Sequence, residues 1–570
     1  MGVRRQRRDT LARDEGKSED ACRAGDKNVR MTIAASRRDR LLEKKRAQTG
    51  FRTKEESMTS RFGWFSPRAP SPARRNFLKM AGVLGAATLL PGAAVARTDL
   101  GPTGLAPGDM DATELAAAIK ARRISPLEAV DAAIARVQAV QPSINCISEE
   151  LFDRARQRAA TIDLSAPFAG VPYLIKDEAD IIGKSKHFGS RLDKVMPIAK
   201  RNDILVERCE QIGLNPFART TMSEFGILPT TETLAYGVTR NPWNLDHVPG
   251  GSSGGAAAAV AAGIVPTAHG SDGAGSLRIP ASNCGLVGLK TSRDRIAGGS
   301  FLGQPFCLSR TVRDTANQLA LVENRGADAA YPPIGHVTGP AKKRLRIGFI
   351  MNGLSGHRPS RDVVDSIDAT VGLLEGLGHK VDETRWPFDG TKFVEDFMLA
   401  YMAKAKATRA RMTGGKSPPD PALIKGLIEA ASFDVGTLGS EFSDQEIAEA
   451  YVRMAVSSVA YFEMFDKMDV LVTPVLLTPP VKIGEINGSI PFPVLLMRLN
   501  RYADYTMLQN ASGGPAISLP MHWTKDDLPV GVQFASGLGD ERTLLELAFE
   551  LEQAQPWAQR RPLLWAPSRV

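Results

Sequence analysis

The chain has 570 residues, of which 43% are hydrophobic and 24% charged, so it can bury a large core in one or two domains. Its formal net charge of +9 is unevenly distributed, since residues 1–96 carry 22 basic and 10 acidic side chains. The remaining residues, 97–570, carry 50 basic and 53 acidic side chains. The body of the protein is therefore slightly acidic, which argues against nucleic acid as its partner.

A leader peptide explains the basic N-terminal region. Arg74 and Arg75, followed by Asn76-Phe77-Leu78-Lys79, precede a weakly apolar run that ends in Ala94-Val95-Ala96. A basic stretch, an apolar stretch and an A-x-A site make a signal peptide, and the arginine pair resembles the twin-arginine type. The apolar run is too short, and too rich in glycine and proline, for a transmembrane anchor.

The leader divides the chain into three predicted segments. Residues 1–57 are polar and aperiodic, which is typical of a disordered extension or of a start assigned too early, with Met58 as the alternative start. Residues 58–96 form the twin-arginine signal peptide and residues 97–570 the mature domain. We expect a periplasmic or secreted protein with no stable membrane anchor once the leader is removed.

The cysteines and histidines show no metal-binding or redox spacing. We therefore expect no metal and no cofactor. Buried free thiols are the state that folding before export favours, although the sequence leaves disulfides open for the four cysteines of the body: Cys146, Cys209, Cys284 and Cys307.

Hydrophobic periodicity predicts alternating helices and strands after the leader. Helices are expected over residues 113–122, 126–140, 149–161, 256–262, 363–377 and 444–465. Strands are expected over residues 170–175, 263–268, 345–350, 470–473 and 516–519. This alternation indicates an α/β protein with a largely internal sheet.

Two glycine-framed serines precede the all-apolar helix predicted over residues 256–262. Ser252 and Ser253 lie between Gly250-Gly251 and Gly254-Gly255, at the helix N-terminus, where unpaired N–H groups gather. A simple N-cap turn is the structural alternative. A second loop of small residues, 270–282, could converge its backbone N–H groups on one point, and Lys176 closes an apolar strand, where it could be desolvated.

These motifs resemble the amidase signature family of serine hydrolases. The resemblance rests on Ile175-Lys176-Asp177, residues 250–255 and residues 270–282, and continues through residues 222–226 and 240–245. It spans most of residues 108–570 and implies a single large domain with a central mixed, twisted β-sheet covered by helices on both faces. The C-terminal segments 531–535 and 555–562 are similar to the branch named for 6-aminohexanoate-cyclic-dimer hydrolase.

The resemblance also implies roles for the two serines and the lysine. Ser276 would be the nucleophile, and Ser252, after a cis peptide bond from Gly251, would bridge Ser276 to Lys176. A neutral Lys176, without a carboxylate partner, would be the general base. Ser253 would support Lys176 by hydrogen bonding.

The loop before and after Ser276 would stabilise the reaction's oxyanion. Asp272 and Arg278 would pair and hold the loop's shape, and the oxyanion would be bound by the N–H groups of Gly273, Ala274, Gly275 and Ser276. The family usually has glycine where this chain has Ala274, and an alanine that needed φ > 0 would be strained by roughly 1 kcal/mol.

Several functions remain open from the sequence. The leading hypothesis is hydrolysis of cyclic or linear amides of ω-amino acids; a peptide amidase and an aryl or aliphatic amidase are alternatives. An impaired amidase that only binds its ligand is the alternative that Ala274 suggests. The pattern G-x-S-x-G around Ser253 would instead suit an α/β-hydrolase with His522, but the residues before it do not resemble a strand. A small amide is the expected partner, and a homodimer is one of the oligomeric states left open.

The leader generates the first prediction. Mass spectrometry of exported protein should find a mature N-terminus near Arg97, and Arg74→Lys with Arg75→Lys should leave the precursor in the cytoplasm, because the arginine pair is the export signal. Arg61→Lys with Arg68→Lys is the matched control and should be exported normally. A full-length chain that stays in the cytoplasm and is active there would contradict the prediction.

Overall fold

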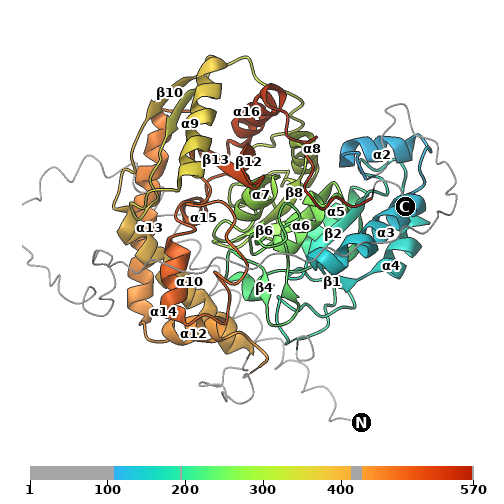
Figure 1. Cartoon of the computed structure of the whole chain (residues 1–570), viewed down its shortest axis with the longest axis horizontal. Helices are drawn as coiled ribbons and strands as arrows, with labels where there is room; N and C mark the ends of the chain where they lie inside the picture. The colour runs from blue at the N-terminus through green and yellow to red at the C-terminus, as the bar shows by residue number, and fades with distance from the viewer. Residues whose placement is uncertain (1–107, 193–195, 413–425, 568–570) are drawn as a thin grey trace, which may run out of the picture. The chain divides into compact units, whose positions relative to one another are not determined.

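An eight-stranded mixed sheet forms the centre of the protein in the computed structural model, which describes residues 108–192, 196–412 and 426–567 (Figure 1). The predicted extension, the leader and the Met58 start lie outside these residues. Strands β10, β9 and β11 run parallel, and the other neighbours run antiparallel. The strand order is β10 (Lys380–Glu383), β9 (Arg346–Phe349), β11 (Val470–Pro474), β13 (Pro529–Ser536), β12 (Ala516–Trp523), β7 (Val287–Lys290), β8 (Gln304–Ser309) and β6 (Thr267–Asp272).

A three-stranded sheet brings Lys176 to the edge of this central sheet. Its order is β1 (Ile147–Glu150), β3 (Asn215–Thr220) and β2 (Pro172–Lys176), and β2 packs beside β6. The Lys176 N–H donates to His269 Nδ1 of β6 (3.3 Å). The end of β2 and the loop that follows β6 therefore lie together.

Helices cover both faces of the central sheet, as the resemblance implies. They are α2 (Ala112–Lys120), α3 (Pro126–Ile144), α4 (Phe152–Ala159), α5 (Ile204–Gln211), α6 (Gly254–Ala261), α7 (Arg278–Cys284), α8 (Val312–Val322), α9 (Arg361–Gly376), α10 (Gly390–Met412), α12 (Ala430–Leu438), α13 (Asp444–Glu463), α14 (Phe492–Asn500), α15 (Met507–Ser512) and α16 (Glu541–Ala554). Gln533 of β13 accepts a hydrogen bond from Arg278 of α7 (2.7 Å), so alternate residues of that strand face α7. Val532 and Phe534 point the other way, into an apolar core against α9 and α16.

A second layer of helices packs beside the sheet. Helix α10 contacts α12 and α13, and α12 contacts α14, so the four lie side by side, coloured yellow-orange to red in Figure 1. Their apolar side chains form two further core clusters. None of the helices within the described ranges is long and apolar enough to cross a membrane.

Several predicted boundaries are wrong by a few residues, since α3 extends to Ile144 and β12 to Trp523, and two further errors have a clear physical cause. The sequence predicts one helix over residues 149–161, but β1 pairs with β3 over Ile147–Glu150 and α4 begins only at Phe152. The strand predicted over residues 263–268 begins at Thr267, because Gly263 (φ +75°) ends α6 and the following apolar residues are core loop. In the first case pairing with a distant strand overrides local hydrophobicity.

Helix α6 is buried on every side, which explains its small residues. All of Gly254–Ala261 is buried, and a Cβ at Gly255 would lie 2.6 Å from the backbone N of Thr221. Glycine at this position therefore allows the helix to approach β3 closely.

Gly255→Ala should lower the free energy of unfolding by about 1–3 kcal/mol, because the added methyl overpacks a rigid backbone contact. Urea unfolding measures the change. The matched control is Gly372→Ala in α9, where an added Cβ meets no atom within 4 Å; it should raise stability by up to about 1 kcal/mol through helix propensity. Equal effects of the two variants would contradict the packing argument.

Candidate active site

The structure brings Lys176 and Ser252 into direct contact. Lys176 is fully buried at the end of β2, and its Nζ lies 2.8 Å from Ser252 Oγ. The Gly251–Ser252 peptide bond is cis, as the resemblance implies. Ser276, in the loop between β6 and α7, lines a cavity together with Gly251. Within the described part of the chain the Ser276 side chain has no hydrogen-bond partner, so its hydroxyl is available to a ligand.

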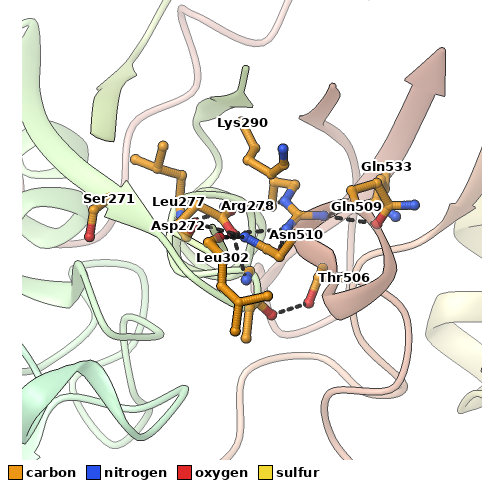
Figure 2. Close-up of polar contacts among 12 residues, drawn as sticks. Ser271, Asp272, Leu277, Arg278, Lys290, Leu302, Thr506, Gln509, Asn510 and Gln533 are labelled. Atoms are coloured by element: carbon orange, nitrogen blue, oxygen red, sulfur yellow. Dashed lines mark hydrogen bonds and ion pairs between the residues drawn. The ribbon is translucent and has the colours of Figure 1, made fainter. Parts of the chain in front are cut away.

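A buried ion pair holds the loop that carries Ser276, as expected. Arg278 donates to both carboxylate oxygens of Asp272, from Nε to Oδ2 (2.9 Å) and from Nη2 to Oδ1 (2.8 Å), as Figure 2 shows. The remaining donor positions of the guanidinium bind Gln509 Oε1 (3.0 Å), Gln533 Oε1 (2.7 Å) and Asn510 Oδ1 (2.6 Å). The pair thus ties this loop to α15 and β13.

Asp272 remains ionised in this setting. Burial by itself raises the pKa of Asp272, but the charge and hydrogen bonds of Arg278, with a further hydrogen bond from Asn510, lower it below the usual range. The carboxylate therefore stabilises the folded loop wherever the unfolded chain would also be ionised, above about pH 4. That contribution is lost as the pH falls through the depressed pKa.

One of the four predicted oxyanion donors is occupied. The Gly275 N–H donates to Asp272 Oδ1 (2.7 Å), so the prediction that it binds the oxyanion is wrong for this structure. The N–H groups of Gly273, Ala274 and Ser276 have no hydrogen-bond partner among the residues that the structure describes. These three groups are the candidate oxyanion donors.

The glycine requirement of this loop falls at Gly275 rather than at Ala274. Gly275 has φ +124°, whereas Ala274 is not among the residues with positive φ. A Cβ at Gly275 would also lie 2.8 Å from Ile279 Cδ1. Thr506 Oγ1 donates to the Ala274 carbonyl (2.6 Å) and so fixes the orientation of the peptide group between Ala274 and Gly275. The backbone strain that the sequence suggests for Ala274 is therefore absent, and with it the reason to expect an impaired site.

Ser253 does not bind Lys176. Its Oγ donates to the Ser271 carbonyl (3.2 Å) and accepts from the Ser271 N–H (3.3 Å), and it is Ser271 Oγ that lies 2.9 Å from Lys176 Nζ. Ser253 is the N-cap residue of α6, but its side chain does not cap the helix, so the simple N-cap alternative also fails. Sequence reasoning missed Ser271, although it lies in the small-residue loop already singled out.

Lys176 has a carboxylate neighbour, contrary to the prediction. Glu178 Oε1 lies 3.4 Å from Lys176 Nζ. Burial lowers the pKa of Lys176, and the negative charge of Glu178 opposes this without reversing it. Glu178 lies in the turn directly after β2, where the Ala179 N–H donates to the Lys176 carbonyl (3.1 Å), so its position two residues after Lys176 is the signal that could have identified it.

The cavity beside Ser276 is apolar and encloses about 770 Å³, its opening included. No charged side chain of the described residues lines it. Tyr401 contributes a hydroxyl, which donates to the Gly226 carbonyl (2.8 Å). Its lining is Gly226, Ile227, Leu228, Pro229, Gly251, Ala274, Ser276, Ile279, Phe397, Met398, Tyr401, Val435, Phe492, Leu495, Leu499, Asn500, Ala503 and Met507.

Other nucleophiles are poorly placed. An α/β-hydrolase elbow needs a strand directly before Ser253, but the nearest described strand before it, β5 (Gly237–Val238), ends 15 residues earlier. All four cysteines of the body are buried and free, as expected. Burial raises the pKa of Cys146 and that of Cys209 to about 12, so these thiols stay protonated.

Removing Asp272 should destabilise the fold. Asp272→Ala leaves the buried Arg278 without its counter-ion and should cost about 3–5 kcal/mol in urea unfolding. Asp365→Ala is the control, since Asp365 pairs with Arg361 at the surface (2.8 Å). Its loss should lower the free energy of unfolding by about 0.5 kcal/mol or less. A wild-type unfolding midpoint for Asp272→Ala would contradict this account.

Comparison with known proteins identifies the family of the chain. The amidase family model matches residues 128–545, and a twin-arginine translocation signal model matches residues 71–91. AmiC of Mycobacterium tuberculosis, an amidase by name, is 37% identical over 463 residues, covering 79% of this chain and 96% of AmiC. The 6-aminohexanoate-cyclic-dimer hydrolase of a Pseudomonas species is 33% identical over 498 residues, covering 80% of this chain and 97% of that enzyme.

Solved structures give the same assignment. A 6-aminohexanoate cyclic dimer hydrolase complexed with substrate superposes with a TM-score of 0.71 at 30% identity, covering 80% of this chain and 99% of the other. A bacterial aryl acylamidase of the amidase signature family superposes with a TM-score of 0.70 at 25% identity, covering 79% and 97%. The chain therefore belongs to the amidase signature family, whose members hydrolyse non-peptide C–N bonds.

Proposed function

We propose that the protein is an exported amidase that hydrolyses uncharged carboxamides through Ser276, Ser252 and Lys176. The observation that carries the proposal is the 2.8 Å contact between Lys176 Nζ and Ser252 Oγ. The residue before Ser252, Gly251, lines the same cavity as Ser276. A buried amine whose pKa is lowered, a hydroxyl hydrogen-bonded to it and a serine that lines the adjacent cavity are the parts that nucleophilic acyl transfer needs.

The proposed reaction moves a proton from Ser276 through Ser252 to Lys176 and later returns it by the same groups. Neutral Lys176 takes the proton of Ser252 while Ser252 takes that of Ser276, and Ser276 Oγ attacks the amide carbonyl carbon. The oxyanion is bound by the N–H groups of Gly273, Ala274 and Ser276. The proton then returns through Ser252 to the leaving nitrogen as the C–N bond breaks. Water, deprotonated by the same route, hydrolyses the acyl-enzyme and releases the carboxylic acid.

The cavity supports an uncharged substrate. A charged group would lose its hydration against apolar side chains without gaining an ionic partner there. The free ammonium and carboxylate of linear ω-amino-acid oligomers are therefore unfavourable in this cavity. Cyclic amides of ω-amino acids, which carry no charge, fit this cavity better, and the relatives of this chain include 6-aminohexanoate-cyclic-dimer hydrolases. Aryl or aliphatic amides are the second choice, since a solved aryl acylamidase has the same fold.

The twin-arginine signal supports action outside the cytoplasm. Such signals carry proteins that have already folded. A mature enzyme in the periplasm or the medium would meet amides taken up from the surroundings, which suits a site for small neutral substrates.

Activity should depend on Ser276 and Lys176. We expect hydrolysis of the cyclic 6-aminohexanoate dimer or of hexanoyl-4-nitroanilide, and Ser276→Ala should abolish it. Lys176→Ala should reduce kcat/KM by at least about a hundredfold, as loss of a general base does. His522→Ala is the control and should keep wild-type activity.

The pH profile and covalent labelling check the same roles. The rate should rise with pH as Lys176 loses its proton, and the rise should come below the usual lysine range because burial lowers that pKa. A fluorophosphonate probe should label Ser276, as located by mass spectrometry. Label on Ser253 together with loss of activity in His522→Ala would contradict the proposal.

A further inference from the structure

Glu178 stands beside the proposed base without a role in the proposed reaction. Its Oε1 lies 3.4 Å from Lys176 Nζ, and its side chain is 25% exposed whereas that of Lys176 is fully buried. An isolated buried lysine would lose its proton without help, so a neighbouring carboxylate needs its own explanation.

The contacts of Lys176 Nζ suggest what Glu178 does. Three oxygens surround the amine: Ser252 Oγ at 2.8 Å, Ser271 Oγ at 2.9 Å and Glu178 Oε1 at 3.4 Å. A neutral amine has two N–H donors and one lone pair. If the two N–H groups point at Ser271 and Glu178, the lone pair points at Ser252, which is the direction that proton abstraction requires. The protonated amine has three donors, which match the same three oxygens.

We infer that Glu178 is a positioning residue, which aims the lone pair of Lys176 at Ser252 and stabilises the lysine ammonium that forms when the proton is transferred. The inference rests on the proposed function. In other nucleophile–base pairs a third group orients the base, and Glu178 would do the same for Lys176.

The surrounding charges favour an ionised Glu178. Burial raises the pKa of Glu178, but the charge of Lys176, a hydrogen bond from Ser271 and the charge of Lys404 outweigh it, so the pKa lies below its usual value. Burial lowers the pKa of His269 to about 4, so this imidazole is neutral at neutral pH. The other titratable groups that interact with the Lys176–Glu178 pair are Asp272, Asp203 and Tyr401.

A charge next to the base has two opposite kinetic consequences. It stabilises the ammonium, so the free enzyme needs a higher pH to lose the proton. It also stabilises the same ammonium in the transition state, so the deprotonated enzyme reacts faster. Removing the charge should therefore lower the plateau rate and move the acid limb of the profile to lower pH, a combination that loss of packing does not produce.

Glu178→Gln tests the inference, because glutamine keeps the shape and removes the charge. With hexanoyl-4-nitroanilide, which does not titrate between pH 5 and 10, the acid limb of kcat/KM should move down by about one pH unit or more. The plateau should fall about tenfold. Glu178→Asp keeps the charge and should leave the limb within about half a unit of wild type.

The matched control is Asp180→Asn, which removes a carboxylate from the same segment. Asp180 pairs with Lys186 (2.8 Å) and is not among the groups that shift the pKa of Lys176. Its profile should match wild type. Thermal unfolding of each variant identifies any loss of fold, and the pH dependence of fluorophosphonate labelling of Ser276 gives the same limb independently of the substrate.

The outcomes separate this inference from the proposed function. A Glu178→Gln enzyme with an unmoved limb overturns the inference, whether its plateau is normal or reduced, because a reduced plateau alone is what a structural role would give. An active Ser276→Ala enzyme would instead overturn the proposed function itself.

Discussion

The buried pair of Asp272 and Arg278 is the interaction on which the site depends. A charge this deep in the protein is tolerated only when its partner and its remaining hydrogen-bonding positions are satisfied. Here the guanidinium is held by Gln509, Asn510 and Gln533, so the β6–α7 loop is joined to α15 and β13. The position of Ser276, the candidate nucleophile, is therefore set by residues more than 200 positions away in the chain.

The same carboxylate shapes the loop itself. By accepting the N–H groups of Gly275 (2.7 Å) and Leu277 (3.2 Å), Asp272 turns the backbone inward at these two positions. The intervening N–H of Ser276, and those of Gly273 and Ala274, are left without protein partners in the described structure. The same hydrogen-bond network that stabilises the loop therefore leaves the three N–H groups of the candidate oxyanion site free for a ligand.

Electrostatics also links the loop to the lysine on the neighbouring strand. Burial lowers the pKa of Lys176, while Glu178 and Asp272 act in the opposite direction. The site thus balances easy deprotonation against stabilisation of the ammonium. The apolar cavity next to it contributes no compensating charge, which leaves Glu178 as the nearest carboxylate able to tune the base.

The sequence by itself determined the α/β class, the twin-arginine signal and the family, and it singled out Lys176, Ser252 and Ser276 as candidates, because glycine-framed loops and strand ends are local patterns. Only the tertiary structure decided that Glu178 and Ser271 contact the lysine, that Gly275 rather than Ala274 needs glycine, and that Ser253 binds the Ser271 backbone. The tertiary structure also forms the cavity beside Ser276, because side chains of α10, α12 and α14 come together in its walls. These features depend on distances between side chains that are far apart in the chain, and such distances are set by packing of the whole core, which local periodicity does not encode.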